Sequence, residues 1–125
     1  MPKLISHAPY FPVPDIAKAV AYYESTLGFK ANYVVGDLFA ICVRDGLSIM
    51  LRRVAEPAKI APNEAQGGTW DVFFWIDDAK GLHAELEGRG ATVVYGPLVQ
   101  EEYQMLEFAV RDLNGYVLGF GQALK

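Results

Sequence analysis

The sequence predicts an α+β fold in which one βαβββ unit occurs twice. Two segments carry apolar residues at helical spacing, and each is preceded by one strand-like run and followed by three. Each helical segment begins at an aspartate and reaches a glycine thirteen residues later, at Asp15 to Gly28 and Asp77 to Gly90. The tripeptide Val-Arg-Asp precedes the last turn of each half, at residues 43–45 and 110–112. We therefore expect one domain, residues 1–125, built from two copies of one unit.

The first module, residues 4–52, opens with a strand-like run at residues 6–13. Asp15 is a favoured helix N-cap, and Gly28 is placed to end the helix that follows. Three short apolar runs complete the module as strands, at residues 29–35, 38–43 and 47–51. The pairs Gly36-Asp37 and Asp45-Gly46, which separate these runs, are typical of hairpin turns.

A linker at residues 53–68, rich in Pro, Ala and Gly, precedes the second module at residues 69–121. The same order returns there. A strand at residues 69–76 leads to the cap Asp77-Asp78 and to a helix that ends at Gly90. Strand-like runs follow at residues 91–95, 104–110 and 116–120, with Gly96-Pro97 and Asn114-Gly115 as the turns between them.

Composition and charge exclude several classes of protein. A net charge of −4 argues against a nucleic-acid partner, because such proteins carry a basic face. No apolar run approaches the roughly 20 residues that span a bilayer, so we expect a cytoplasmic protein without a membrane partner. The single cysteine, Cys42, lies in an apolar run and is expected to be a buried structural thiol rather than a nucleophile.

Short motifs occur in the same order in both halves. The first half contains Pro12-Val13-Pro14-Asp15-Ile16, Ala21-Tyr22-Tyr23 and Leu27-Gly28-Phe29. The second contains Ile76-Asp77-Asp78, Leu82-His83-Ala84-Glu85-Leu86, Arg89-Gly90-Ala91 and the run Phe-Ala-Val-Arg-Asp-Leu-Asn-Gly at residues 108–115. Over nearly the whole chain these motifs resemble the glyoxalase, bleomycin-resistance and extradiol-dioxygenase superfamily, the vicinal oxygen chelate proteins. Leu113 and Asn114 depart from the Pro and Asp usual in that family.

The resemblance implies that each module curls its mixed sheet into a cup with the helix outside, and that two cups form a site. Metal-dependent members carry one ligand on the first and one on the last strand of each module. The matching positions here are Ala8, Met50, Asp71 and Gly119, of which only Asp71 has a donor for a hard or borderline cation. We therefore expect no metal and no cofactor. The alternative is a β-bulge that turns the neighbouring His7 into the cup.

The cup should be lined by every second residue of each strand. If Asp71 faces inward, then Phe73 and Trp75 share its side, while Val72, Phe74 and Ile76 face the helices. An aromatic wall around one carboxylate suits a flat, partly cationic ligand. The alternative is that Phe73 and Trp75 only fill the core. The candidate ligand-binding residues are Tyr10, Met50, Asp71, Phe73, Trp75 and Phe108.

Three hypotheses about function follow. The first, in line with the bleomycin-resistance members that the chain resembles, is a homodimeric, metal-free protein that sequesters a small aromatic, cationic compound and gives antibiotic resistance. The second is an enzyme of the vicinal oxygen chelate type, a lyase, isomerase or dioxygenase with an atypical or absent metal site, or a metal-free catalyst with Asp71 as general base. The third is a structural or interaction module whose cup is filled by its own side chains. The chain has no recognisable catalytic triad, and no catalytic residue is predicted.

Overall fold

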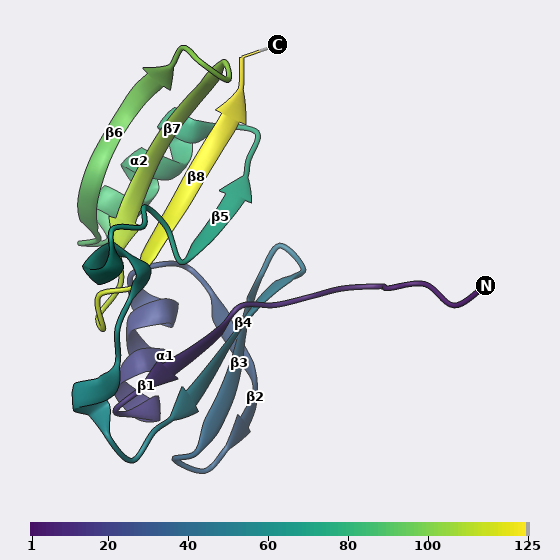
Figure 1. Ribbon diagram of the computed structural model, residues 1–125, viewed down its shortest axis with the longest axis vertical. Coiled ribbons are helices and arrows are strands. Elements are labelled where there is room, and N and C mark those ends of the chain that lie inside the picture. The colour runs from purple at the N-terminus through teal and green to yellow at the C-terminus, as the bar shows by residue number, and fades with distance from the viewer. Residues whose placement is uncertain (125) are drawn as a thin grey trace.

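A computed structural model describes residues 1–124 as two four-stranded mixed sheets, each accompanied by one helix. The two modules follow one another along the long axis of the molecule (Figure 1). The first contains β1 Tyr10–Val13, α1 Ile16–Ser25, β2 Lys30–Val35, β3 Phe39–Arg44 and β4 Leu47–Arg53. The second contains β5 Val72–Trp75, α2 Ala79–Gly88, β6 Thr92–Gln100, β7 Met105–Arg111 and β8 Val117–Ala123. The predicted fold class, two βαβββ units, is confirmed.

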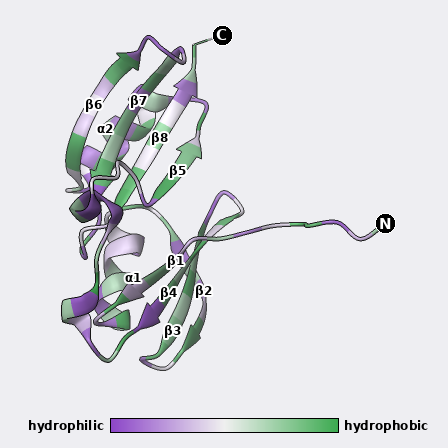
Figure 2. Cartoon of the chain, in the orientation of Figure 1, coloured by the Kyte–Doolittle hydropathy of each residue, from purple (hydrophilic) through white to green (hydrophobic). Residues whose placement is uncertain are grey.

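The two sheets have the same topology. Their strand orders are β1-β4-β3-β2 and β5-β8-β7-β6. In each sheet the first strand pairs with the last in parallel, and the other pairs are antiparallel. The strands carry long hydrophobic stretches, whereas the linker between β4 and β5 includes strongly hydrophilic residues (Figure 2). Repetition in the sequence therefore corresponds to repetition of the backbone.

Both helices begin at an aspartate cap. Asp15 accepts a hydrogen bond from the backbone N–H of Lys18 at 2.9 Å, and Asp78 accepts one from Gly81 at 2.9 Å. The second cap is thus Asp78, one residue later than the equal spacing suggests. Gly28 and Gly90 follow the helices with φ of +76° and +94°, a backbone region that favours glycine. No helix within residues 1–124 is long and apolar enough to cross a membrane.

Alternate residues of each strand face the helices and form the core. In the first module these include Phe11, Leu51 and Cys42, all buried. In the second they include Phe108 and Phe120, whose rings stack with centroids 5.0 Å apart. Burial raises the pKa of Cys42 to about 11, so its thiol is a structural group, as predicted.

The first and the sixth strand depart most from their predicted bounds. The first begins at Tyr10 rather than Ser6, because β1 pairs with β4 only from Tyr10 onward. Residues 1–9 leave the body of the molecule as an extended arm (Figure 1). The predicted turn at Gly96-Pro97 is wrong: β6 continues through it, and the irregularity is absorbed as a register shift between Tyr95 and Leu98.

Specific contacts join the two modules. The rings of Phe11 and Tyr116 stack with centroids 4.3 Å apart, and the Tyr116 hydroxyl donates to the carbonyl of Pro12 at 2.6 Å. The Tyr23 hydroxyl donates to Asp112 Oδ2 at 2.6 Å. These contacts link residues that are about a hundred positions apart in the chain, so they fix one module against the other.

Candidate functional site

In each module we call the side of the sheet that is turned away from the helix the concave face. In the first module this face carries Tyr10 and Met50, which are partners in register on β1 and β4. Both lie on the side opposite the buried Phe11 and Leu51. The Tyr10 side chain is 54% exposed. Two predicted site residues are thus neighbours on an open surface, and the predicted alternation of β1 holds from Tyr10 onward.

The concave face of the second module carries a row of three aromatic side chains, Trp70, Phe73 and Trp75, which we call the aromatic row. Ring centroids are 4.6 Å apart between Trp70 and Phe73 and 5.2 Å apart between Phe73 and Trp75. A Cβ at Gly119 would lie 2.5 Å from Trp70 Cδ1 and 2.8 Å from Phe73 Cδ1. Glycine therefore lets the inner rings lie directly on β8, while Trp75 stays 73% exposed.

Asp71 precedes β5 and is held by two backbone amides. Its Oδ1 accepts from Asn63 N at 2.9 Å, and its Oδ2 accepts from Val117 N at 2.8 Å. A carboxylate that is partly removed from water needs hydrogen-bond donors, and these two amides supply them. Asp71 therefore ties the linker to the start of β8.

Phe108 does not belong to the concave face. It is fully buried, stacks on Phe120 and contacts the ring of His83 on α2 at a centroid distance of 5.3 Å. In β7 the side chains alternate, so Phe108 faces the helix while its neighbour Glu107 faces the concave side. The inclusion of Phe108 among the lining residues is corrected accordingly.

The largely apolar cavity between the modules, which we call the junction cavity, has a volume of about 550 Å³. Its aromatic lining comes from both modules: Phe29, Phe74, Trp75 and Phe120. Gly121 and the aliphatic Leu27, Leu82 and Leu86 add to the wall. The volume is within the range of pockets that enclose drug-sized ligands.

A second cavity, of about 730 Å³, lies between β1 and the linker. Tyr10 and Asp71 line it together with Tyr116 and the linker residues Glu56 and Lys59. The predicted site residues are thus divided. Tyr10 and Asp71 share this linker cavity, Trp75 lines the junction cavity, and Phe73 is half-buried within the aromatic row.

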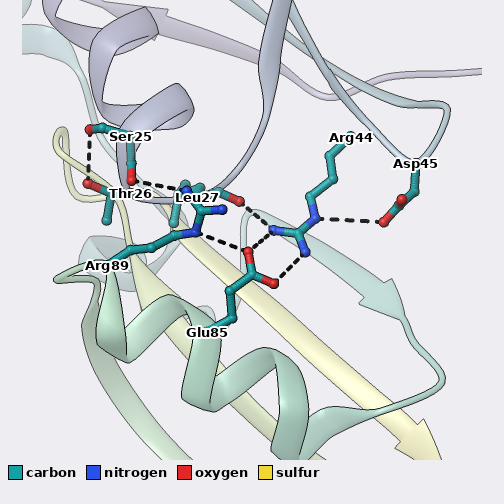
Figure 3. Close-up of polar contacts among 7 residues, drawn as sticks. All are labelled: Ser25, Thr26, Leu27, Arg44, Asp45, Glu85 and Arg89. Atoms are coloured by element: carbon teal, nitrogen blue, oxygen red, sulfur yellow. Dashed lines mark hydrogen bonds and ion pairs between the residues drawn. The ribbon is translucent and has the colours of Figure 1, made fainter.

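An ion-pair cluster joins the two modules (Figure 3). Its members Leu27 and Arg44 also line the junction cavity. Arg44 donates to both carboxylate oxygens of Glu85, at 2.8 and 3.0 Å, and to the carbonyl of Leu27 at 2.9 Å. Arg89 donates to Glu85 at 3.0 Å from the other side. The hydrogen bond from Arg44 lowers the pKa of Glu85, and Glu85 raises the pKa of Arg44. Glu85 therefore compensates the positive charge of Arg44, although Arg44 lines the junction cavity.

The sequence reasoning missed a buried polar network on the concave face of the second module. Glu107 is fully buried on β7, and its Oε1 accepts from the Tyr103 hydroxyl at 2.8 Å. Its Oε2 accepts a short hydrogen bond from the Tyr95 hydroxyl, which itself accepts from Trp70 Nε1 at 2.8 Å. Burial and the bond to Glu107 raise the pKa of Tyr95 well above its ordinary value. Side chains alternate along β7, so a core position for Phe108 implies that its neighbour Glu107 points to the concave face.

The residues at the expected ligand positions do not fit a metal ion. Met50 and Gly119 offer no oxygen or nitrogen side-chain donor, and both oxygens of Asp71 accept from backbone amides. Ala8 precedes β1, and the neighbouring His7 is exposed on the extended arm. No group of three or more His, Cys, Asp or Glu side chains within residues 1–124 could hold a metal ion.

Comparison with known families gives one extensive match. A sequence model of the family described as Glyoxalase/Bleomycin resistance protein/Dioxygenase superfamily matches residues 5–120. No curated protein matches the chain significantly.

Solved structures share the fold at low sequence identity. The bleomycin resistance determinant encoded on transposon Tn5 has a TM-score of 0.76 and 19% identity, covering 96% of this chain and 98% of that one. TioX from Micromonospora sp. ML1 has a TM-score of 0.73 and 22% identity, with coverage of 96% and 99%. The bleomycin-binding protein of bleomycin-producing Streptomyces verticillus, solved with copper(II)-bleomycin, has a TM-score of 0.69 and 22% identity, with coverage of 98% of each chain.

Proposed function

Because the chain belongs to the glyoxalase/bleomycin resistance protein/dioxygenase superfamily, we propose that it is a binding protein that sequesters a small aromatic compound. The observation that carries this proposal is the junction cavity, in which an exposed tryptophan, Trp75, stands among apolar side chains from both modules. A flat ligand would cover Trp75 and gain stacking contacts of about 0.5 to 1.5 kcal/mol each beyond the area buried. The aromatic lining therefore favours a ring system over a polar metabolite.

Two of the similar structures support the class of ligand. One is named a bleomycin-binding protein and another a bleomycin resistance determinant. By analogy, we propose that this chain sequesters an aromatic antibiotic or a related toxic compound and so gives resistance to it. The identity of the compound has to come from binding experiments, because the lining residues here are this chain's own.

We also propose that the protein works as a homodimer. Leu4 and Ile5 on the extended arm are 99% and 88% exposed, and Trp75 is 73% exposed. A second copy of the chain packed against these side chains would remove them from water. Sedimentation equilibrium at micromolar concentration should give the mass of a dimer. A monomer throughout the concentration range would contradict this part of the proposal.

The test of ligand binding uses quenching of tryptophan fluorescence by naphthylbutanol, a neutral aromatic probe. Trp75→Ala should weaken binding about tenfold, because the probe loses its main stacking partner. Trp70 remains in this variant as the fluorescent reporter. Tyr33→Ala removes another exposed aromatic side chain, on β2 and outside the cavity, and should leave the affinity unchanged. Equal affinity of wild type and Trp75→Ala would overturn the assignment of the cavity.

A further inference from the structure

We propose that the free edge of β5 binds a short linear peptide, whose backbone adds one strand to the second sheet and whose side chains enter the junction cavity. The inference rests on the proposed function, because it concerns the same cavity. It adds the chemical class of the ligand and the atoms that hold it. These atoms are the main-chain N–H and C=O groups of Phe73 and Trp75, so recognition by this edge requires no charged group on the ligand.

The pairing of β5 decides which of its backbone groups are free. β5 is an outer strand of its sheet, and its neighbour is β8. The N–H of Ile76 donates to the carbonyl of Gly121 on β8 at 2.9 Å. In a parallel pair the N–H and C=O of one residue face the same neighbour, and successive residues alternate between the two sides. Phe74 and Ile76 therefore face β8, whereas the N–H and C=O groups of Phe73 and Trp75 face outward.

The open stretch of this edge is short. Its four outward groups have no hydrogen-bond partner within residues 1–124. Before it, the linker covers the chain, because Asn63 donates to the carbonyl of Trp70 and to the carboxylate of Asp71. After it, the chain leaves the sheet and enters α2 at Ala79. An edge of this length fits a peptide of about three residues rather than a long strand of another protein.

The junction cavity lies at this edge. Its lining includes three consecutive residues, Phe74, Trp75 and Ile76. Successive side chains of a strand point to opposite faces, so a cavity that touches all three lies against the backbone at the end of β5. In an added strand, the side chains opposite Phe74 and Ile76 point to the same face as these two residues. They would therefore project toward the apolar wall of the cavity, which includes Phe29 of the first module.

The first module has a closed edge at the matching position. Pro12 lies three residues before the helix cap Asp15, just as Trp75 lies three residues before the cap Asp78. Proline has no N–H to donate, and the carbonyl of Pro12 accepts from the Tyr116 hydroxyl at 2.6 Å. The outer edge of β1 is therefore blocked where that of β5 is open. This difference identifies β5, and not β1, as the strand that a peptide can extend.

The first experiment titrates the wild type with the peptide acetyl-Phe-Ala-Phe-amide by isothermal calorimetry. Its central alanine would exchange both backbone hydrogen bonds with Trp75, and its two phenyl side chains would face the cavity. Methylation of the alanine nitrogen removes the donor to the Trp75 carbonyl and should weaken binding about tenfold. Methylation of the nitrogen of the second phenylalanine, which faces away from the edge, is the matched control and should leave the affinity unchanged.

The second experiment compares Trp75→Pro with Trp75→Ala. Both variants remove the indole, but only proline also removes the main-chain N–H that the peptide needs. Trp75→Pro should therefore bind the peptide about fivefold more weakly than Trp75→Ala, whereas the two variants should bind naphthylbutanol equally. Proline at this position copies Pro12, with which β1 keeps its pairing to β4. Circular dichroism checks that both variants are folded, and if Trp75→Pro is not, the methylated peptides decide.

Several outcomes would overturn the inference. Equal affinity for the peptide and its alanine-methylated form would mean that the edge of β5 does not hold the ligand. A wild type that binds naphthylbutanol but not the peptide would remove the role of the edge and leave the proposed function intact, whereas failure to bind either compound would overturn both. Loss of a dimer in Trp75→Pro but not in Trp75→Ala, measured by sedimentation, would assign the edge to a second copy of the chain instead of a peptide.

Discussion

The two modules share their strand order and the parallel pairing of the first strand with the last, yet their concave faces have different chemistry. The first presents Tyr10 and Met50 on an open surface. The second presents the aromatic row and a buried glutamate that is hydrogen-bonded by two tyrosines. Core positions on the helix side remain apolar in both. The topology of each sheet therefore does not depend on the side chains of its concave face. At these positions the two copies of a repeated unit can acquire different functions.

The same contrast occurs in the Val-Arg-Asp tripeptide that both modules contain. Asp45 forms a two-residue turn with Gly46, with φ of +53° and +79°, and its side chain is 86% exposed. Asp112 is buried, and it accepts from the hydroxyl of Tyr23 and from the backbone amides of Asn114 and Tyr116. A longer turn lets Asp112 fold back over the backbone, whereas Asp45 points into solvent. One sequence motif thus serves a local turn in one module and a contact between modules in the other.

Replacement of each aspartate by asparagine should separate these two roles. Asp112→Asn should lower the free energy of unfolding by about 2 kcal/mol, because the buried Tyr23 hydroxyl loses its charged acceptor. Asp45→Asn should change it by less than about 0.5 kcal/mol, since asparagine tolerates a positive φ and the site is exposed. Urea unfolding followed by circular dichroism measures both. Equal losses in the two variants would show that the tripeptide has the same role in both modules.

Local physics explains which features the sequence could predict. Alternation in β1 and β5 correctly puts Tyr10 and Phe73 on the concave side, because a strand has a fixed period of two. The Asp15 cap and the Asp45-Gly46 turn follow equally from local backbone chemistry. All of these features depend only on residues that are close together in the chain.

The features that were missed depend on partners that are distant in the chain. The acceptor role of Asp71 needs amides at residues 63 and 117, which no local pattern brings together. The network at Glu107 joins three segments through side-chain hydroxyls. The sequence places Phe108 on the wrong face because tertiary packing decides which face of β7 meets the helix, and an offset of one residue exchanges the two faces.

The arginines of the repeated tripeptide provide a smaller test of the same comparison. Arg44 pairs with Glu85 across the two modules, with side chains 25% and 35% exposed, whereas Arg111 pairs with Glu64 of the linker, with side chains 36% and 43% exposed. Arg44→Met should lower the free energy of unfolding by about 1 kcal/mol at neutral pH, since it also removes the donor to Leu27 O. Arg111→Met should cost less than about 0.5 kcal/mol. The two matched variants are compared by urea unfolding.

The pH dependence identifies the source of the larger effect. Arg44 holds the pKa of Glu85 below its ordinary value in the folded protein, so the pair stabilises the fold fully above the unfolded pKa of about 4.3. This contribution is lost as the pH falls through the lower, folded pKa. The difference in stability between wild type and Arg44→Met should therefore be constant at neutral pH and should shrink in acid. A difference that persists unchanged in acid would mean that Arg44 acts through its contact with Leu27 and its apolar stem, and not through the ion pair that joins the modules.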